Sequence, residues 1–546
     1  MRGAWSRNRW EKASISTHDG ASSVSFETLF HFPSSFSRRA GMGQFHFDVP
    51  DVASDFIGKS LWNDAYICGI EGVPWQSRIE FDGSRLTLTR AIDSSGKLYM
   101  ACPLKGIGFR TLSTCSLRPL DDLRPLDDQP HLLPLEFARG SCYRARIQSD
   151  AWQRAGLTLS KEFKDLLQEG TSRFLDAAQR RADPDGSSEA AMEAILLLEK
   201  AISDLGESYA VQSIAFRKQR EPQIGTLLAG TVTPPAPLGL QSHAAFTDAF
   251  NSAAIRLNWA DIETDSGRFS YDNAEEAIEF CSSKGMRIIG GPLIDFRERL
   301  MPHWLYLLED DFDAFLNAVT HFVETTVNKF RGKVQLWNCA SGLNTAGPMQ
   351  LSDEQIMRLS VGILQTVRRA DPTTPAIISF DQPFGEYLGK NREGISPLHF
   401  ADALVRSGLG MAGLGLEVRM NYVDKATFPR SAVELGQMID RWATLGMPML
   451  VQLAVPGGVG PDPMAEAPCD VLQHDLQSGD PASEQLRIAG PLIRTLLAKH
   501  IVHGIVWEGW SDQVPHVVSH TGLIDADGHE RPLLEYLTRL RRDFLV

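Results

Sequence analysis

The feature that most limits the fold of this chain is a regular alternation of short apolar segments with amphipathic helical segments from residue 224 onward. Strands that alternate with helices form a parallel sheet, because each helix returns the chain to the start of the next strand. Eight such units close into a barrel. The sequence therefore predicts an α/β fold with a (β/α)8 TIM barrel over residues 222–546. The eight candidate strands are 225–231, 253–259, 286–291, 333–338, 375–380, 413–419, 449–455 and 503–508.

The region before the barrel has two different patterns. Residues 42–150 contain short β-like runs, up to about residue 147, that are separated by glycine, proline and aspartate, which predicts a β-sandwich-like domain. Residues 151–221 contain two segments with apolar residues at helical spacing, separated by a turn-like segment at 183–186, which predicts a helical linker. Residues 1–41 are expected to be a disordered leader or the result of a misassigned start, because strand-like sequence begins directly after Met42.

Composition excludes some classes of partner. The net charge of −14 argues against nucleic acid, whose non-specific binding requires clustered lysine and arginine. No segment approaches the roughly 18 uninterrupted apolar residues of a membrane span, so no membrane partner is expected. The start shows no secretory signal, and seven cysteines without a CxxC pair indicate reduced thiols. The cysteine usage suggests a cytoplasmic location, which the sequence does not establish.

Short motifs follow several of the predicted strands in a fixed order. They are Trp-Ala-Asp-Ile-Glu at 259–263, Gly-Arg-Phe-Ser-Tyr-Asp at 267–272, Gly-Met-Arg-Ile-Ile-Gly-Gly-Pro-Leu-Ile-Asp-Phe at 285–296, Lys-Val-Gln-Leu-Trp-Asn-Cys-Ala-Ser-Gly at 333–342, Gly-Leu-Gly-Leu-Glu-Val-Arg at 413–419, Gly-Ile-Val-Trp-Glu-Gly-Trp-Ser-Asp at 504–512 and Gly-Leu-Ile-Asp-Ala-Asp-Gly at 522–528. Each motif is weakly specific alone, and the ordered set is more specific than any member.

This ordered set resembles the family 10 glycoside hydrolases, endo-β-1,4-xylanase-like enzymes, over roughly residues 222–546. The resemblance implies a barrel that acts on O-glycosidic bonds of a β-linked polysaccharide such as xylan. It also implies an oligo- or polysaccharide partner and no cofactor. No metal site is expected, because the histidines near the C-terminal end lack metal-ligand spacing.

Both glutamates that the resemblance implies are substituted in this chain. Ser341 and Gly342 stand where the family has Asn-Glu on strand four, and that Glu is the family's acid. On strand seven Leu453 aligns with the family's nucleophile, and a shift of one residue brings only Gln452. The retaining mechanism needs two carboxyl groups about 5–5.5 Å apart. The ordinary family mechanism is therefore not expected here.

Glu417 and Glu508 are the candidate catalytic residues, because they replace uncharged residues at the ends of strands six and eight, where the βα loops converge. If the protein is active, Glu508 is expected to be the acid, because Trp507 and Trp510 would desolvate its carboxyl group and raise its pKa. Glu417, beside Arg419, is expected to stay ionised as nucleophile or base. The alternative is that Glu417 and Arg419 form a structural ion pair and that Glu508 only donates or accepts hydrogen bonds.

Further residues at the strand ends are candidates for substrate binding. Indole rings stack on sugar faces, and polar side chains hydrogen-bond to sugar hydroxyl groups, although tryptophan at a strand end is also ordinary core packing. The candidates are Asn258, Trp259, Trp337, Asn338, Asp381, Arg419, Gln452 and Trp510. In the N-terminal region, Trp62, Tyr66 and Trp75 are expected either in the domain core or on a glycan-binding surface.

Three functions remain compatible with the sequence. The first is a divergent glycoside hydrolase with relocated carboxylates. The second is a non-catalytic glycan-binding pseudoenzyme, and the third is a structural or interaction role. The sequence does not decide among them, and it leaves open the sugar, the linkage, the oligomeric state and the role of the N-terminal domain.

Overall fold

The computed structural model describes residues 43–119, 130–234, 240–297, 300–345, 347, 349–390, 394–472 and 479–545. The predicted leader at 1–41 lies outside the described residues. No helix in the described ranges is long and apolar enough to cross a membrane. All seven cysteines are described, and they carry free thiols, as predicted.

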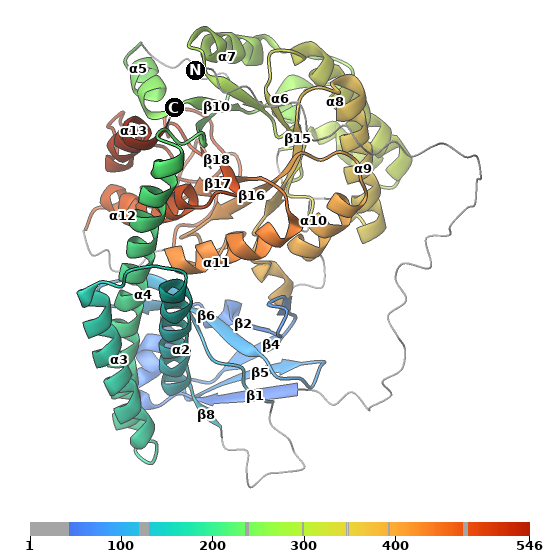
Figure 1. Ribbon diagram of the computed structural model, residues 1–546. Helices are drawn as coiled ribbons and strands as arrows, with labels where there is room; N and C mark the ends of the chain where they lie inside the picture. The colour runs from blue at the N-terminus through green and yellow to red at the C-terminus, as the bar shows by residue number, and fades with distance from the viewer. Residues whose placement is uncertain are drawn as a thin grey trace, which may run out of the picture. The chain divides into compact units, whose positions relative to one another are not determined.

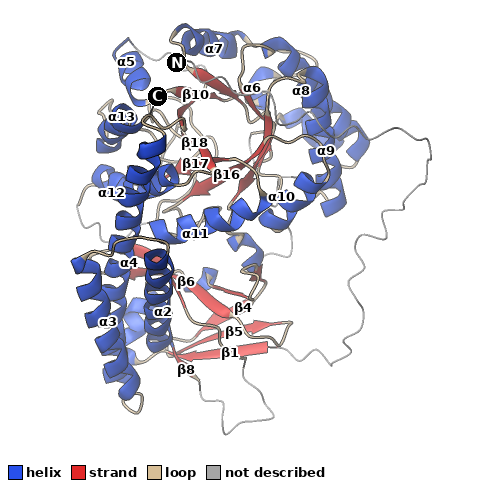
Figure 2. Cartoon of the chain, in the orientation of Figure 1, coloured by secondary structure: helices blue, strands red, loops and turns tan. Residues whose placement is uncertain are grey.

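Eight parallel strands form a closed barrel, in which each strand pairs with the next along the chain and the last pairs with the first (Figures 1 and 2). All eight predicted segments are confirmed, and the TIM-barrel prediction with them. The barrel strands are β9 (Leu227–Val232), β10 (Ser252–Ile255), β11 (Arg287–Gly290), β13 (Leu336–Asn338), β15 (Ala376–Asp381), β16 (Gly413–Arg419), β17 (Met449–Ala454) and β18 (Val502–Trp507).

Helices surround this barrel, and several of them begin at a residue whose side chain caps the helix. Ser352 and Ser431 each begin a helix with a reciprocal capping box, in which the serine hydroxyl and the side chain three residues later satisfy free backbone N–H groups. The helices are α5 (Leu240–Ala249), α6 (Trp259–Ile262), α7 (Asp272–Ser283), η3 (His303–Leu308), α8 (Phe312–Phe330), α9 (Asp353–Ala370), η4 (Glu386–Gly389), α10 (Pro397–Arg406), α11 (Ala432–Trp442), η5 (Ala443–Leu445), α12 (Pro481–Ala498) and α13 (Pro532–Phe544).

The strand register decides which side chains lie inside the barrel. Successive residues of a strand point to opposite faces, so the inward positions repeat every second residue. The deeper inward positions carry small and aliphatic side chains, which form one buried cluster of Ala229, Ala254, Ile289, Ile377, Leu450 and Val506. The next inward positions toward the C-terminal ends are polar. Two short strands, β12 (Ile294–Asp295) and β14 (Ala340–Ser341), pair beyond the barrel sheet at this end.

Two four-stranded sheets lie before the barrel, in the orders β4-β5-β1-β8 and β3-β2-β6-β7. Apolar side chains from both sheets share one buried core with a short helix, which agrees with the predicted β-sandwich-like region. The elements are β1 (Gly43–Asp48), α1 (Asp51–Gly58), η2 (Trp62–Asp64), β2 (Tyr66–Cys68), β3 (Pro74–Trp75), β4 (Arg78–Phe81), β5 (Arg85–Arg90), β6 (Lys97–Leu104), β7 (Gly108–Ser113) and β8 (His131–Leu132).

Three helices connect the sheets to the barrel: α2 (Leu133–Arg154), α3 (Lys161–Gln179) and α4 (Pro184–Arg220). Helices α3 and α4 confirm the two predicted helices, and Asp183 caps α4 at the predicted turn. Helix α2 corrects the expectation of β-like sequence up to residue 147. Its first turns are buried almost all round, so the sequence there lacks the one-sided apolar pattern of an exposed helix.

Candidate active site

Five of the predicted site residues meet at the C-terminal end of the barrel. Asp381 on β15 pairs in register with Glu417 on β16, and Arg419 lies two residues further along the same strand. Glu508 directly follows β18, and Asn338 ends β13. Each of these residues is at most 3% exposed. The predicted grouping of carboxylates at the mouth is therefore present, but the groups are buried.

Arg419 lies at the centre of this cluster. Its Nη1 donates to Asp381 Oδ1 over 3.0 Å, and its Nε donates to Glu508 Oε2 over 3.1 Å. Its Nη2 donates to Glu417 Oε2. One guanidinium group thus binds three carboxylates from three strands. A buried charge is tolerated when it is paired and hydrogen-bonded in this way.

Two further arginines, which the sequence analysis did not single out, complete the cluster. Arg297 pairs with Asp295, and its Nη1 lies 3.5 Å from Glu508 Oε1 and 3.8 Å from Glu417 Oε2. Arg256 lies 3.6 Å from Asp295. The two candidate catalytic carboxylates therefore share contacts with both Arg297 and Arg419. In the sequence, Arg297 directly follows the strand-three motif, but nothing there shows that it reaches strands six and eight.

The pKa values of the two glutamates are shifted in opposite directions. Burial raises the pKa of Glu417; Arg297 and Arg419 oppose the rise, and the nearby carboxylates add to it. Burial alone would also raise the pKa of Glu508, but Arg419, Arg297 and Arg256 outweigh it and hold that pKa below its ordinary value. These directions favour Glu417 rather than Glu508 as the carboxyl group that holds a proton, which is opposite to the roles expected from the sequence, and the roles of both residues stay a prediction.

The structure shows the surroundings of the residues that replace the family's glutamates on strands four and seven. Ser341 Oγ donates to Glu417 Oε1. A Cβ atom on Gly342 would lie 3.6 Å from Cγ of Arg297, so the Arg297 side chain runs beside the position of the missing acid. On β17, Leu450 lies in the barrel interior, so Gln452 also points inward, whereas Leu453 packs in the outer core. Gln452 is therefore the inward polar residue on strand seven, and its side chain is an amide rather than a carboxylate.

The three tryptophans that were predicted to bind substrate are not brought to one open surface. Trp259, Trp337 and Trp510 are 2%, 0% and 5% exposed and belong to the core between the barrel and its helices. Trp337 Nε1 donates to Asp371 Oδ2 over 3.1 Å. Asp371 precedes the N-terminal end of β15, away from the barrel mouth. This arrangement corrects the expectation that their indole faces ring the mouth. Their role in substrate binding stays a prediction.

The amide candidates have local partners. Asn338 Oδ1 accepts a hydrogen bond from Ser379 Oγ over 3.1 Å, inside the barrel. Asn258 Nδ2 donates to Asp261 Oδ2 over 2.8 Å, and its buried Oδ1 has no hydrogen-bond partner. Gln452 is the partly exposed member of the predicted set.

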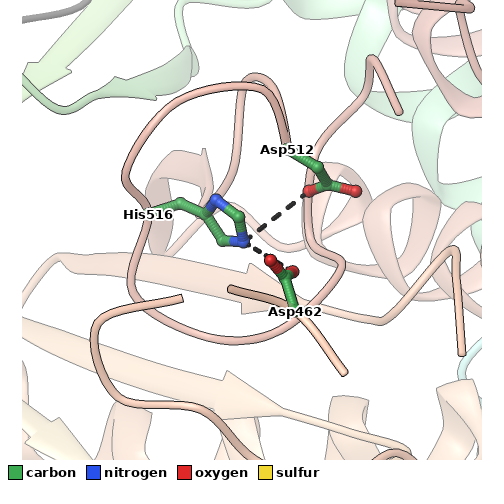
Figure 3. Close-up of side chains that lie close together, drawn as sticks. All are labelled: Asp462, Asp512 and His516. Atoms are coloured by element: carbon green, nitrogen blue, oxygen red, sulfur yellow. Dashed lines mark hydrogen bonds and ion pairs between the residues drawn. The ribbon is translucent and has the colours of Figure 1, made fainter. Parts of the chain in front are cut away.

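A second polar cluster, which the sequence analysis missed, joins the loops after β17 and β18 (Figure 3). His516 Nε2 lies 2.9 Å from Asp462 Oδ2 and 3.8 Å from Asp512 Oδ1, while its Nδ1 faces the Val514 carbonyl oxygen at 2.8 Å. Burial alone would lower the pKa of His516, but these oxygen acceptors outweigh it and raise the pKa. Arg531 also pairs with Asp512 at 2.7 Å.

These three residues offer the ligand atoms of a metal site, but cationic side chains already neutralise the carboxylates. Both ring nitrogens of His516 face oxygen acceptors, which suits a protonated imidazole ring rather than a metal ligand. The predicted absence of a metal site stays a prediction. Asp462 and His516 are 54 positions apart in the sequence, which explains why no spacing motif revealed the cluster.

Comparisons with known proteins match part of the chain. The family model for glycosyl hydrolase family 10 matches residues 219–347. Endo-1,4-beta-xylanase B of Thermotoga neapolitana is 22% identical over 205 residues, which are 36% of this chain and 55% of that protein. Endo-1,4-beta-xylanase 3 of Hypocrea jecorina is 24% identical over 192 residues, or 33% of this chain and 53% of that protein. The chain thus spans about half the length of these relatives.

Two solved structures are similar to the barrel region. Xylanase 10B of Thermotoga petrophila in complex with xylobiose has a TM-score of 0.44 and 14% identity, and the match covers 58% of this chain and 95% of that chain. Native xylanase 10B of Thermotoga maritima has the same TM-score and identity, with 58% and 96% coverage. The family-model match and the curated relatives confirm the predicted resemblance of this chain to the family 10 glycoside hydrolases.

Proposed function

We propose that this chain is a divergent glycoside hydrolase that acts on a β-1,4-linked, xylan-type polysaccharide, with Glu417 and Glu508 as its carboxyl pair. The observation that carries the proposal is the convergence of two buried glutamates on two shared arginines at the barrel mouth, where the pKa of Glu417 is raised and that of Glu508 is lowered. Environments that push two carboxyl pKa values apart assign one group as acid and the other as base or nucleophile. The names of the curated relatives, endo-1,4-beta-xylanases, support the choice of substrate.

In this proposal the Glu417 carboxyl group donates its proton to the glycosidic oxygen as the bond to the anomeric carbon breaks. The Glu508 carboxylate, which stays ionised, attacks the anomeric carbon or takes a proton from the attacking water. Arg419 binds both groups and so fixes their separation. Its positive charge also stabilises the carboxylate that remains after proton transfer.

Arg297 sets the main requirement on substrate binding. Its guanidinium contacts both carboxylates, so a sugar that reaches them has to displace it. The Arg297 side chain is 12% exposed, whereas the carboxylates behind it are 1% exposed. Replacing Arg297 with alanine should therefore open access to the pair while leaving Arg419 in place.

The test is hydrolysis of xylan and of an aryl β-xyloside by the wild type, Glu417→Gln and Glu508→Gln. General acid catalysis typically contributes a factor of about 10² to 10⁴, so each variant should lose at least about a hundredfold in kcat. Glu136→Gln is the matched control, because Glu136 is a buried glutamate paired with an arginine on helix α2. Full activity in both mouth variants would refute the relocated pair.

A non-catalytic glycan-binding protein is the second candidate function. The specific observation in its favour is that two arginines neutralise and cover both glutamates, while strands four and seven carry Gly342 and Gln452. This candidate predicts no hydrolysis by the wild type and slower migration in a gel that contains xylan. Hydrolysis that disappears in Glu508→Gln would eliminate it.

A further inference from the structure

A separate cavity of about 290 Å³ lies between the N-terminal sheets and the barrel. Its walls come from β2, β6, β7, helix α2, the loop after β15 and helix α11. Of these, β2, β6 and α2 are drawn below helix α11 in Figure 1. None of the carboxylates at the barrel mouth lines it. Small-molecule sites are concave and have about this size or more, with a few polar groups among apolar and aromatic walls.

Aromatic rings form much of the cavity wall. Tyr66 and Tyr99 stack, with ring centroids 5.3 Å apart and ring planes 11° from parallel. The Arg430 guanidinium lies 5.7 Å from the Tyr99 ring and 4.5 Å from the Phe384 ring, so it is held between them. Tyr143, on helix α2, is 49% exposed. Flat aromatic faces of this kind can cover the face of a ring-shaped ligand.

Part of the charge around the cavity is compensated within the protein. Arg430 donates to Glu386 Oε1 over 2.9 Å and to the Tyr66 hydroxyl group. Arg144 pairs with Glu199, and its Nη1 lies 3.5 Å from Glu434. These groups hold the two domains together and fix the walls.

Two other cations at the cavity have no such compensation. Among the residues that the structure describes, neither Lys97 nor Arg441 has a carboxylate within salt-bridge distance. Lys97 Nζ lies 5.9 Å from the Tyr143 ring, and Arg441 donates to the carbonyl oxygens of Glu71 and Gly72. In addition, the Nε atoms of Arg144 and Arg430 are buried without a hydrogen-bond partner. These cationic groups can therefore bind an anion in the cavity.

We propose that this cavity is a second binding site, for a sugar acid: a pyranose ring that carries a carboxylate. The carboxylate pairs with Lys97 and Arg441, and the ring lies against Tyr99 and Tyr143. The requirement for an anion rests on the cavity alone, whereas the choice of a sugar ring also rests on the proposed function of the barrel.

The experiment is isothermal titration calorimetry of the full chain with methyl β-D-glucuronide, with the neutral methyl β-D-glucoside and with benzoate. The glucuronide should bind saturably, and the glucoside at least about tenfold more weakly, because it lacks the charge-assisted contacts. Lys97→Gln and Arg441→Gln should each weaken glucuronide binding about tenfold. Raising the salt concentration should weaken binding as well, because Lys97 is partly exposed and Arg441 is exposed.

Lys105→Gln is the matched control, because Lys105 is an exposed lysine of the same domain that does not line the cavity. Equal affinity for glucuronide and glucoside, tighter binding of benzoate than of glucuronide, or unchanged binding by the Lys97 and Arg441 double variant would overturn the proposal. Glu508→Gln should bind the glucuronide as the wild type does. The loss of xylan hydrolysis and the loss of glucuronide binding are thus separate results.

Discussion

Replacing Arg419 with methionine tests whether the carboxylates at the mouth depend on one central cation. The substitution removes hydrogen bonds to Asp381, Glu417 and Glu508, each at most 3% exposed, and leaves Arg297 in ion-pair contact with the two glutamates. Removing one partner of a buried ion pair costs about 3–5 kcal/mol, chiefly because the other charge stays buried and unpaired. We expect the free energy of unfolding to fall by about that amount at pH 7.

The pH dependence of this loss gives a second readout. Without Arg419, the folded-state pKa values of Glu417 and Glu508 should rise above their unfolded values, since burial then acts against less opposing charge. Groups with raised pKa values stabilise the fold at low pH and lose that contribution as the pH rises through the folded pKa. The deficit of Arg419→Met relative to the wild type should therefore shrink between about pH 7 and pH 5, close to the unfolded glutamate pKa.

Urea denaturation followed by tryptophan fluorescence measures this change, because Trp507 is buried next to Glu508. Arg358→Met is the control, since Arg358 pairs with Asp313 at 2.9 Å on the surface, where salt bridges contribute little. An Arg419→Met loss no larger than that of the control, or a loss that grows toward pH 5, would refute the reasoning.

Three further predictions concern the core, the second polar cluster and access to the site. Trp510→Ala should lower the free energy of unfolding by about 3–5 kcal/mol in urea denaturation, because Trp510 is only 5% exposed in the core; weaker binding of xylo-oligosaccharides by the folded variant would support its predicted role in substrate binding. Asp462→Asn should lower the pKa of His516, measured by NMR, because it removes the carboxylate that stabilises the protonated ring; an unchanged pKa would show that the pair is not coupled. Arg297→Ala should increase xylan hydrolysis or xylan binding by uncovering the glutamates, and reduced binding would show that Arg297 is itself a substrate ligand.

The barrel could be predicted from the sequence because each of its strands is a short apolar run between helical segments. Helix α2 could not be predicted in this way, because its first turns are buried on nearly all sides and have no exposed polar face that would produce a helical pattern in the sequence. The positions of the motif residues along the strands were also predictable, since the C-terminal ends of parallel strands meet at one mouth.

It was harder to predict from the sequence whether each strand residue faces the barrel interior or the surrounding helices. Trp337 precedes Asn338 and Trp507 precedes Glu508, so a two-residue period already places these tryptophans outside when the polar residues face inward. The same period selects Gln452 over Leu453 on β17. Arg297, in contrast, contacts Glu417 and Glu508, which are more than a hundred positions away in the sequence, and no local sequence pattern indicates these contacts.

The pH dependence of kcat/KM on an aryl β-xyloside tests the central claim most directly. Because burial raises the pKa of Glu417 and the arginines lower that of Glu508, activity should fall on the basic side as Glu417 loses its proton and on the acid side as Glu508 gains one. Glu417→Gln should lose the basic limb together with most of the rate on substrates with poor leaving groups. A basic limb that persists in Glu417→Gln would contradict the assignment of Glu417 as the acid.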